Sequence, residues 1–187
     1  MIYQIDSHEE GIKALSFSQE SLRFIDIRAS QCRIWEPAVL IRKDFDGESN
    51  SEVSQPLSVS SKRSYVIETS SSPEIVTICC HMDGKTVFCG MRDGKIQCYR
   101  TADGGNDGIL YSHVTNISIV ALAVVSSDDI KLISADEAGR LIIKKISNEQ
   151  GHWLACETIA DIRFNESTAS LLVNPILGRV LVVGQTI

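Results

Sequence analysis

Short apolar segments rich in β-branched residues recur along this chain, and they limit its fold more than any other feature. Turn-forming residues separate them, and many have no polar face, which is typical of strands in stacked sheets and not of amphipathic helices. Clear examples are GIKALSFS (11–18), RFIDIRA (23–29), CRIWE (32–36), EIVTICCH (74–81), KTVFCGM (85–91), KIQCYR (95–100), IVALAVVS (119–126), IKLISA (130–135) and RLIIKKI (140–146).

These segments form repeats. Three stretches align, namely ALSFSQESLRFIDIRASQCRIW, TICCHMDGKTVFCGMRDGKIQCY and ALAVVSSDDIKLISADEAGRLIIK, and a fourth copy over 169–184 is incomplete. The second and third copies lie about 44 residues apart, which is the period of a four-stranded propeller blade. The sequence therefore predicts an all-β fold with one domain over 1–187, a partial β-propeller of about three and a half four-stranded blades. The expected blades cover approximately 8–43, 65–103, 113–147 and 152–187.

The interval between the first and second copies is longer by about 20 residues. The excess coincides with DFDGESNSEVSQPLSVSSKRS (44–64), in which serine and acidic residues dominate. We expect a surface loop inserted between the first and second repeats, which is either inert or a phosphorylated regulatory segment. The glycine-rich TADGGNDG (101–108) is interpreted as a tight connection leaving the second repeat.

Charge and hydropathy argue against two classes of partner. The chain has 187 residues and a net charge of −6, so it offers no basic field for nucleic acid or for an anionic membrane. It has neither a signal-peptide pattern at the N-terminus nor an apolar run near the roughly 20 residues that span a bilayer. We therefore expect a cytoplasmic protein with reduced cysteines.

The stretch CCHMDGKTVFCGMRDGKIQCYR (79–100) groups four of the six cysteines with a histidine, as a zinc site would. Two Asp-Gly pairs predict hairpin turns of type I′, and counting outward from them sets the register. That register places Cys79 opposite Phe88, Cys80 opposite Val87 and Cys89 opposite Cys98. Since neighbouring residues on a strand face opposite ways, Cys79 and Cys80 cannot both reach one ion. We expect packed thiols, with Cys89 facing Cys98, and no metal.

Other chemical motifs are missing. DGKT (83–86) lacks the upstream glycine of a phosphate-binding loop, and the sequence has no Gly-x-Ser-x-Gly or His-Glu-x-x-His motif. The four histidines are dispersed, and carboxylates cluster only in turns such as Asp136-Glu137, which we expect to be solvated. No catalytic, cofactor-binding or metal-binding residue and no cofactor is predicted.

The pattern H-x3-I-x2-L-x-F-S followed by I-W, from His8 to Trp35, resembles a WD repeat. In that family a loop histidine is tied to an aspartate before the third strand, through a serine or threonine and the tryptophan. Ala29 and Ala138 stand in the aspartate position of the first and third repeats, and Lys144 replaces the tryptophan of the third. The second repeat has no matching histidine, so no repeat is expected to be complete. The structural WD-type positions are His8, Trp35, Asp93, Tyr99 and His113, of which Tyr99 stands in place of the tryptophan and His113 lies near the place of the histidine.

Two segments, LRFIDIRASQCRIWEPAVLIRKD (22–44) and VFCGMRDGKIQCY (87–99), resemble the WD-repeat region of large fungal proteins that carry a nucleotide-binding NACHT domain ahead of the repeats. The resemblance implies that this region senses or binds a protein partner while the NACHT domain is the switch.

Three and a half blades cannot close a ring, which typically needs about four to eight. We therefore expect a fragment of a longer propeller, a truncated gene model, or a half that pairs with another copy. The leading functional hypothesis is a non-enzymatic scaffold or sensor for protein partners. The alternatives are a half-propeller that needs a second chain, and a propeller-type hydrolase in which His8, His113 and Asp136 would converge.

Overall fold

The computed structural model describes residues 12–18, 24–28, 31–35, 65–68, 74–126, 128–174 and 179–185. Within these ranges every regular element is a strand. The first sheet holds β1 (Ile12–Phe17), β2 (Phe24–Arg28), β3 (Gln31–Trp35) and β4 (Tyr65–Glu68). The second holds β5 (Ile75–Cys80), β6 (Thr86–Met91), β7 (Lys95–Arg100) and β8 (Asn106–Ser112). The third holds β9 (Ile119–Ser126), β10 (Ile130–Asp136), β11 (Arg140–Glu149) and β12 (His152–Arg163), and the fourth holds β13 (Ser167–Asn174) and β14 (Arg179–Gln185).

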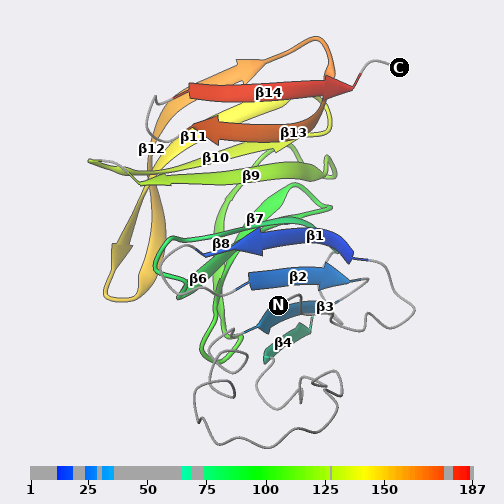
Figure 1. Cartoon of the computed structure of the whole chain (residues 1–187). Coiled ribbons are helices and arrows are strands. Elements are labelled where there is room, and N and C mark those ends of the chain that lie inside the picture. The colour runs from blue at the N-terminus through cyan, green and yellow to red at the C-terminus, as the bar shows by residue number, and fades with distance from the viewer. Residues whose placement is uncertain are drawn as a thin grey trace, which may run out of the picture.

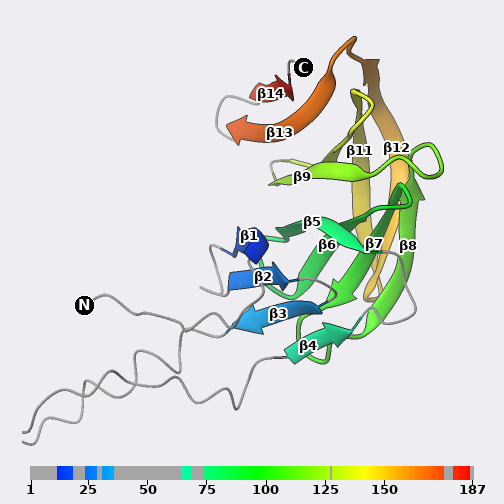
Figure 2. The ribbon, with the colours of Figure 1, turned by 90° about the vertical axis from the view of Figure 1, so that its right-hand side faces the viewer.

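The four sheets are antiparallel meanders that follow one another in space as they do in sequence (Figures 1 and 2). Their first strands lie side by side, with β1 next to β5, β5 next to β9 and β9 next to β13. The described chain is therefore a partial β-propeller with three four-stranded blades and one two-stranded blade, as the repeats predicted. We call these the first to fourth blades.

The blades share one irregularity. In each, the pairing of the first strand with the second shifts by one residue near the start of the first strand, as between Ile75 and Thr77 in the second blade. The same shift lies between Ile12 and Ala14, at Ile119, and between Thr168 and Ser170. This shared bulge allows positions in different blades to be equated.

Apolar layers fill the spaces between blades. The first two layers contain fully buried side chains such as Ile25, Val87, Phe88 and Leu132. The layer between the third and fourth blades is thinner, since most of its members are only partly buried, including Leu171 and Val182. Packing therefore weakens toward the fourth blade.

A long hairpin ties the third blade to the second. Strands β11 and β12 pair well beyond the last residues that β9 and β10 contribute, and this arm extends alongside the second blade (Figure 1). Near its tip Trp153 packs edge-on against Phe88 at 5.2 Å between ring centroids and donates its indole N–H to Thr86 Oγ1 at 3.0 Å. The arm thereby supplies a polar and an apolar contact between blades.

The expected blade boundaries need correction. Strand β12 is the fourth strand of the third blade and not the start of the fourth, which begins at β13, and β4 belongs to the first blade. The insertion at 44–64, which lies outside the described residues, therefore falls between the third and fourth strands of the first blade and not between two blades. Strand β8 also occupies part of the expected connection 101–108. Strands β8 and β12 were missed because they are largely exposed and lack the apolar pattern of inner strands.

The cysteine register is confirmed in the first hairpin and wrong in the second. Cys79 pairs with Phe88 and Cys80 with Val87, as predicted, but Cys89 pairs with Gln97 and Phe88 with Cys98. The second turn is a three-residue loop in which Gly94 has φ 87° and bonds back to the Met91 carbonyl at 3.2 Å, so the count shifts by one. Neither Asp93 nor Asp83 has a positive φ, so neither turn is type I′.

The shift moves Cys89 and Cys98 to opposite faces of the second blade, in different apolar layers. Burial raises the pKa of Cys98 to about 12 and that of Cys89 well above its usual value. Thiols held neutral in this way are poor metal ligands and nucleophiles. Among the described residues no three histidines, cysteines or carboxylates gather where they could hold a metal ion.

Candidate functional site

A buried chain of hydrogen bonds joins the second and third blades near the turns between second and third strands. His113 follows β8 and lies between two side chains of β10, with Nε2 at 2.7 Å from Ser134 Oγ and Nδ1 at 2.9 Å from Asp136 Oδ2. The Tyr111 hydroxyl donates to Ser134 Oγ at 2.9 Å. The side chains of His113 and Asp136 are 0% and 1% exposed.

The donors and acceptors of this network fit one tautomer. Tyr111 donates to Ser134, and the His113 Nδ1–H donates to Asp136. The single serine proton then goes to His113 Nε2 at 2.7 Å in preference to the Ile142 carbonyl, which lies at 3.4 Å. Burial lowers the pKa of His113, although Asp136 acts in the opposite direction. The imidazole is therefore held neutral, which this chain of bonds requires.

Asp136 is buried, so the expectation of a solvated turn is wrong; the third repeat has a turn aspartate after all, although it still lacks the tryptophan. Besides His113, its carboxylate accepts the backbone N–H groups of Ala138 and Arg140 at 3.1 and 2.9 Å, so it also fixes the β10–β11 turn. The alignment put Ala138 in the aspartate position, but Asp136, at the end of β10, makes the bond. Lys144 does not replace the missing tryptophan in the network; its Nζ lies 5.4 Å from the centroid of the Tyr111 ring.

Ser134, His113 and Asp136 are bonded in the same order as the nucleophile, the base and the orienting carboxylate of a hydrolase triad. The alternative hypothesis of a hydrolase required His8, His113 and Asp136 to converge; the structure brings His113 and Asp136 together, while His8 lies outside the described residues. Ser134, the would-be nucleophile, is 0% exposed. Its hydroxyl is enclosed between blades, where a substrate carbonyl cannot approach it.

Two further predicted positions, Asp93 and Tyr99, do not join this network. Trp35 lies in β3 and pairs with Phe24 through the backbone. Asp93 accepts the Lys95 backbone N–H at 3.2 Å and caps its own turn. Tyr99 is buried in the layer between the first two blades and donates to Gln97 Oε1 at 2.6 Å.

The shared bulge identifies the counterparts of these residues in the other blades. Asp136 pairs with Ile119 at the bulge, as Met91 pairs with Ile75 and Gly184 with Thr168. Two positions earlier on the second strand stand Ser134, Cys89 and Val182.

The loop histidine also has a counterpart in the fourth blade. The His113 N–H bonds to the Gly94 carbonyl at 2.9 Å, and the Phe164 N–H bonds to the Gly139 carbonyl at 2.8 Å in the same way. Phe164, Val182 and Gly184 therefore occupy the places of His113, Ser134 and Asp136.

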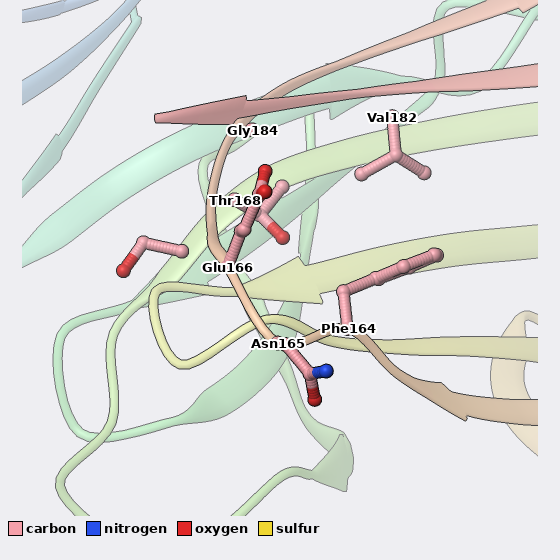
Figure 3. A pocket seen from close by; sticks show the side chains of 7 residues that line it. Phe164, Asn165, Glu166, Thr168, Val182 and Gly184 are labelled. Atoms are coloured by element: carbon pink, nitrogen blue, oxygen red, sulfur yellow. The ribbon is translucent and has the colours of Figure 1, made fainter. Parts of the chain in front are cut away.

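The equivalent space therefore differs among the second, third and fourth blades. In the second blade Met91 and Cys89, both 0% exposed, fill it with apolar groups, and in the third blade the hydrogen-bonded network fills it. In the fourth blade it is a hollow of about 320 Å³ lined by residues 164–168 with Val182 and Gly184 (Figure 3). Glycine, valine and an outward-facing phenylalanine leave space that the larger or bonded groups occupy elsewhere.

The loops on this side of the molecule cross closely over two glycines. A Cβ on Gly94 would lie 2.4 Å from the Val114 carbonyl oxygen, and one on Gly139 would lie 2.3 Å from that of Glu166. Both glycines also have positive φ, so side chains are doubly disfavoured there. The two loops are held in equivalent positions, and we call the surface that they form the loop face.

A second depression on the loop face lies between the second and third blades. Its volume is about 460 Å³ and its lining residues are Glu74, Arg92, Asp93, Asn116, Ser118 and Glu137. Its carboxylates have partners within the chain: Lys13 and Arg92 bond to Glu74 and lower its pKa, and Lys95 pairs with Asp93. The loop face therefore carries two depressions of different charge balance.

No family model matches the sequence, and no curated protein does. Solved structures match in fold. One is a chain from a structure titled "Crystal Structure of Mitotic Checkpoint Complex", with a TM-score of 0.56, 12% identity and 86% of this chain covered. Another is the computationally designed Ika4 protein, with a TM-score of 0.56, 18% identity and coverage of 98% of this chain and 97% of that one. At these identities the similarity is one of fold.

The present chain spans 39% of the length of the checkpoint-complex chain. In the part of the chain that the structure describes, no helix has the length and hydropathy needed to cross a membrane.

Proposed function

We propose that this chain is a non-enzymatic interaction module of WD-repeat type that binds a protein partner through its loop face. The observation that carries the proposal is the loop face itself, where rigid loops anchored over Gly94 and Gly139 surround two depressions. Binding residues are commonly placed on loops that a rigid scaffold holds in position. The match to a chain of a multiprotein complex is compatible with a protein as the partner.

The WD-type assignment is supported by the third blade. Its loop histidine, serine and turn aspartate are bonded to one another as the resemblance implies, with Tyr111 as an additional donor and Lys144 at the place of the tryptophan. We further propose a cytoplasmic location and, from the resemblance of residues 22–44 and 87–99, a role beside a NACHT domain in a fungal signalling protein.

Burial supports a structural role for the network over a catalytic one. Ser134 and His113 are enclosed between two blades, and the neutral imidazole is already committed at both nitrogens. The network resembles a hydrolase triad in connectivity alone.

The first and last blades expose large apolar side chains, which favours the presence of further blades beside them. Leu15 and Phe17 on β1 are 64% and 55% exposed, and Leu172 and Leu181 on the fourth blade are 61% and 59% exposed. We propose that additional blades, of the same polypeptide or of a second copy, cover these end faces. Sedimentation of the 187-residue chain tests the second copy: a well-folded monomer would exclude obligate pairing.

Partner capture tests the main proposal. The tagged chain is incubated with extract of its source organism, with Arg92→Ala and Asn116→Ala on the loop face and Glu149→Ala at the tip of the β11–β12 arm as a control. The proposal predicts a specific partner whose recovery falls with the loop-face variants and is unchanged with Glu149→Ala. A partner lost only with Glu149→Ala, or none recovered by a closed propeller that includes these blades, would contradict it.

A further inference from the structure

We propose that the hollow between the third and fourth blades binds a lysine or arginine side chain of a protein partner. The inference rests on the proposed interaction function and adds the chemistry of the residue that is recognised. It depends on four side chains that line the hollow: Phe164, Glu166, Thr168 and Val182 (Figure 3).

Two of these side chains present hydrogen-bond acceptors. Thr168 is 4% exposed, and no group of the described residues bonds to its hydroxyl. A buried hydroxyl without a partner is unfavourable, so a ligand that bonds to it gains affinity. The three equivalent positions in the other blades, Ile12, Ile75 and Ile119, are isoleucine and need no such partner.

Glu166 provides charge. Its carboxylate lies over Gly184, where a Cβ would come within 2.8 Å of Oε2, so the glycine makes room for it. No lysine, arginine or histidine in the described ranges pairs with this carboxylate. Glu74 and Asp93 in the neighbouring depression differ, because cations of the chain already neutralise them.

The remaining walls suit the body of a long basic side chain. Phe164 is 40% exposed and, with Val182, borders the hollow on the side away from Glu166 and Thr168 (Figure 3). An aromatic face attracts a cation, and apolar walls accept the methylene stem of lysine or arginine.

Other occupants fit less well. A carboxylate or phosphate would be repelled by Glu166, and a purely apolar side chain would leave both Glu166 and Thr168 unbonded. A carboxylate accepts bonds and cannot donate them, so the ligand must carry several N–H donors, which ammonium and guanidinium groups do. A metal ion would find too few ligands here.

The test is a titration of the 15N-labelled 187-residue chain with the acetylated and amidated peptides Gly-Lys-Gly and Gly-Arg-Gly, and with Gly-norleucine-Gly as the uncharged analogue. We expect saturable shifts of the amide signals of residues 164–168 and 182–184 with the basic peptides, and binding of the norleucine peptide that is at least about tenfold weaker. The relative affinities of the lysine and arginine peptides identify which side chain the hollow prefers.

Three variants complete the test. Glu166→Gln should weaken binding about tenfold, whereas Glu157→Gln on the exposed strand β12 should leave it unchanged. Thr168→Ile should abolish binding while raising the melting temperature, which separates loss of the site from loss of the fold.

Equal binding of the norleucine peptide, or full affinity of Glu166→Gln, would overturn the inference. If the captured partner is lost with Arg92→Ala but fully retained with Glu166→Gln, the hollow is not the recognition site although the interaction function stands.

Discussion

The third and fourth blades carry different side chains at the same backbone positions, and the space beside those positions is filled in the third blade and open in the fourth. In the third, His113, Ser134 and Asp136 close the space toward the preceding blade with a buried chain of hydrogen bonds. In the fourth, Phe164, Val182 and Gly184 leave the equivalent space open. The bulge and the loop crossing are the same in both, so these backbone features do not depend on the polar network. The network fills the interface between the second and third blades. Without it, the interface between the third and fourth blades keeps a hollow, which we propose as a binding site.

The largest effect is expected from removing the carboxylate of the network. Asp136→Ala leaves His113 without its acceptor and frees two turn N–H groups, so we expect the free energy of unfolding to fall by about 3–5 kcal/mol. Asp93→Ala in the second blade, whose side chain caps its own turn and pairs with the partly exposed Lys95, should cost about 1 kcal/mol. Urea denaturation measures both, and equal losses would remove the distinction between them.

Next in size is the loop crossing that both blades share. Gly139→Ala places a Cβ against the Glu166 carbonyl at φ 82°, and we expect a loss of about 2–3 kcal/mol in unfolding free energy. Gly151→Ala at the arm tip also has a positive φ, 91°, but nothing lies near its Cβ, so about 1 kcal/mol is expected. If thermal melts show the same loss for both, the close crossing contributes nothing to stability.

A smaller effect of opposite sign is expected in the fourth blade. Thr168→Ile restores the residue type of the other blades, removes an unbonded hydroxyl and fills part of the hollow, so it should stabilise the chain by about 1 kcal/mol. The reverse exchange, Ile119→Thr in the filled third blade, should destabilise by about 2 kcal/mol. Destabilisation by Thr168→Ile in calorimetry would mean that the hollow is already closed in solution.

The smallest expected effect is a pH dependence from His113. Its folded-state pKa is lowered, mainly by burial, so the unfolded chain binds the proton more readily. Stability from the neutral ring is complete above the unfolded pKa of about 6.5 and falls as the pH drops from there toward the folded pKa. Over that window we expect a loss of unfolding free energy smaller than the effects above, measured by denaturation at several pH values.

The matched variants for this window are His113→Gln and His152→Gln. The first should remove most of the pH dependence, because the titrating ring beside Asp136, Ser134 and Tyr111 is gone. The second replaces an exposed histidine on β12 and should preserve it. A pH dependence that His113→Gln does not alter would assign the effect to other groups.

Much of the fold could be predicted from the sequence, because inner strands such as β6 and β9 are apolar enough to be recognised by composition. The outer strands β8 and β12 could not, since solvent faces most of their side chains and their pattern resembles that of a loop. The register of the second hairpin could not either. An Asp-Gly pair predicts a turn, but the number of residues between the two strands depends on which turn residues have a positive φ.

The candidate site was predictable only in part. His113 could be identified by the family pattern, but its partner Asp136 stands two residues before the aligned position, and only the folded turn shows that it reaches the ring. The hollow has no sequence signal of its own, because Phe164, Val182 and Gly184 are ordinary residues in β-rich sequence. The hollow is recognised only when these three positions are compared with the equivalent positions in the third blade, where the hydrogen-bonded network fills the space.

The most direct test of this contrast is the accessibility of two equivalent side chains. Ser134→Cys and Val182→Cys are made separately in a Cys156→Ser background, which removes the exposed native thiol, and reaction with a maleimide is followed under native conditions. We expect Val182→Cys to react at least about tenfold faster, because it lines the hollow while Ser134→Cys is enclosed between blades. Equal rates, or faster reaction of Ser134→Cys, would contradict it.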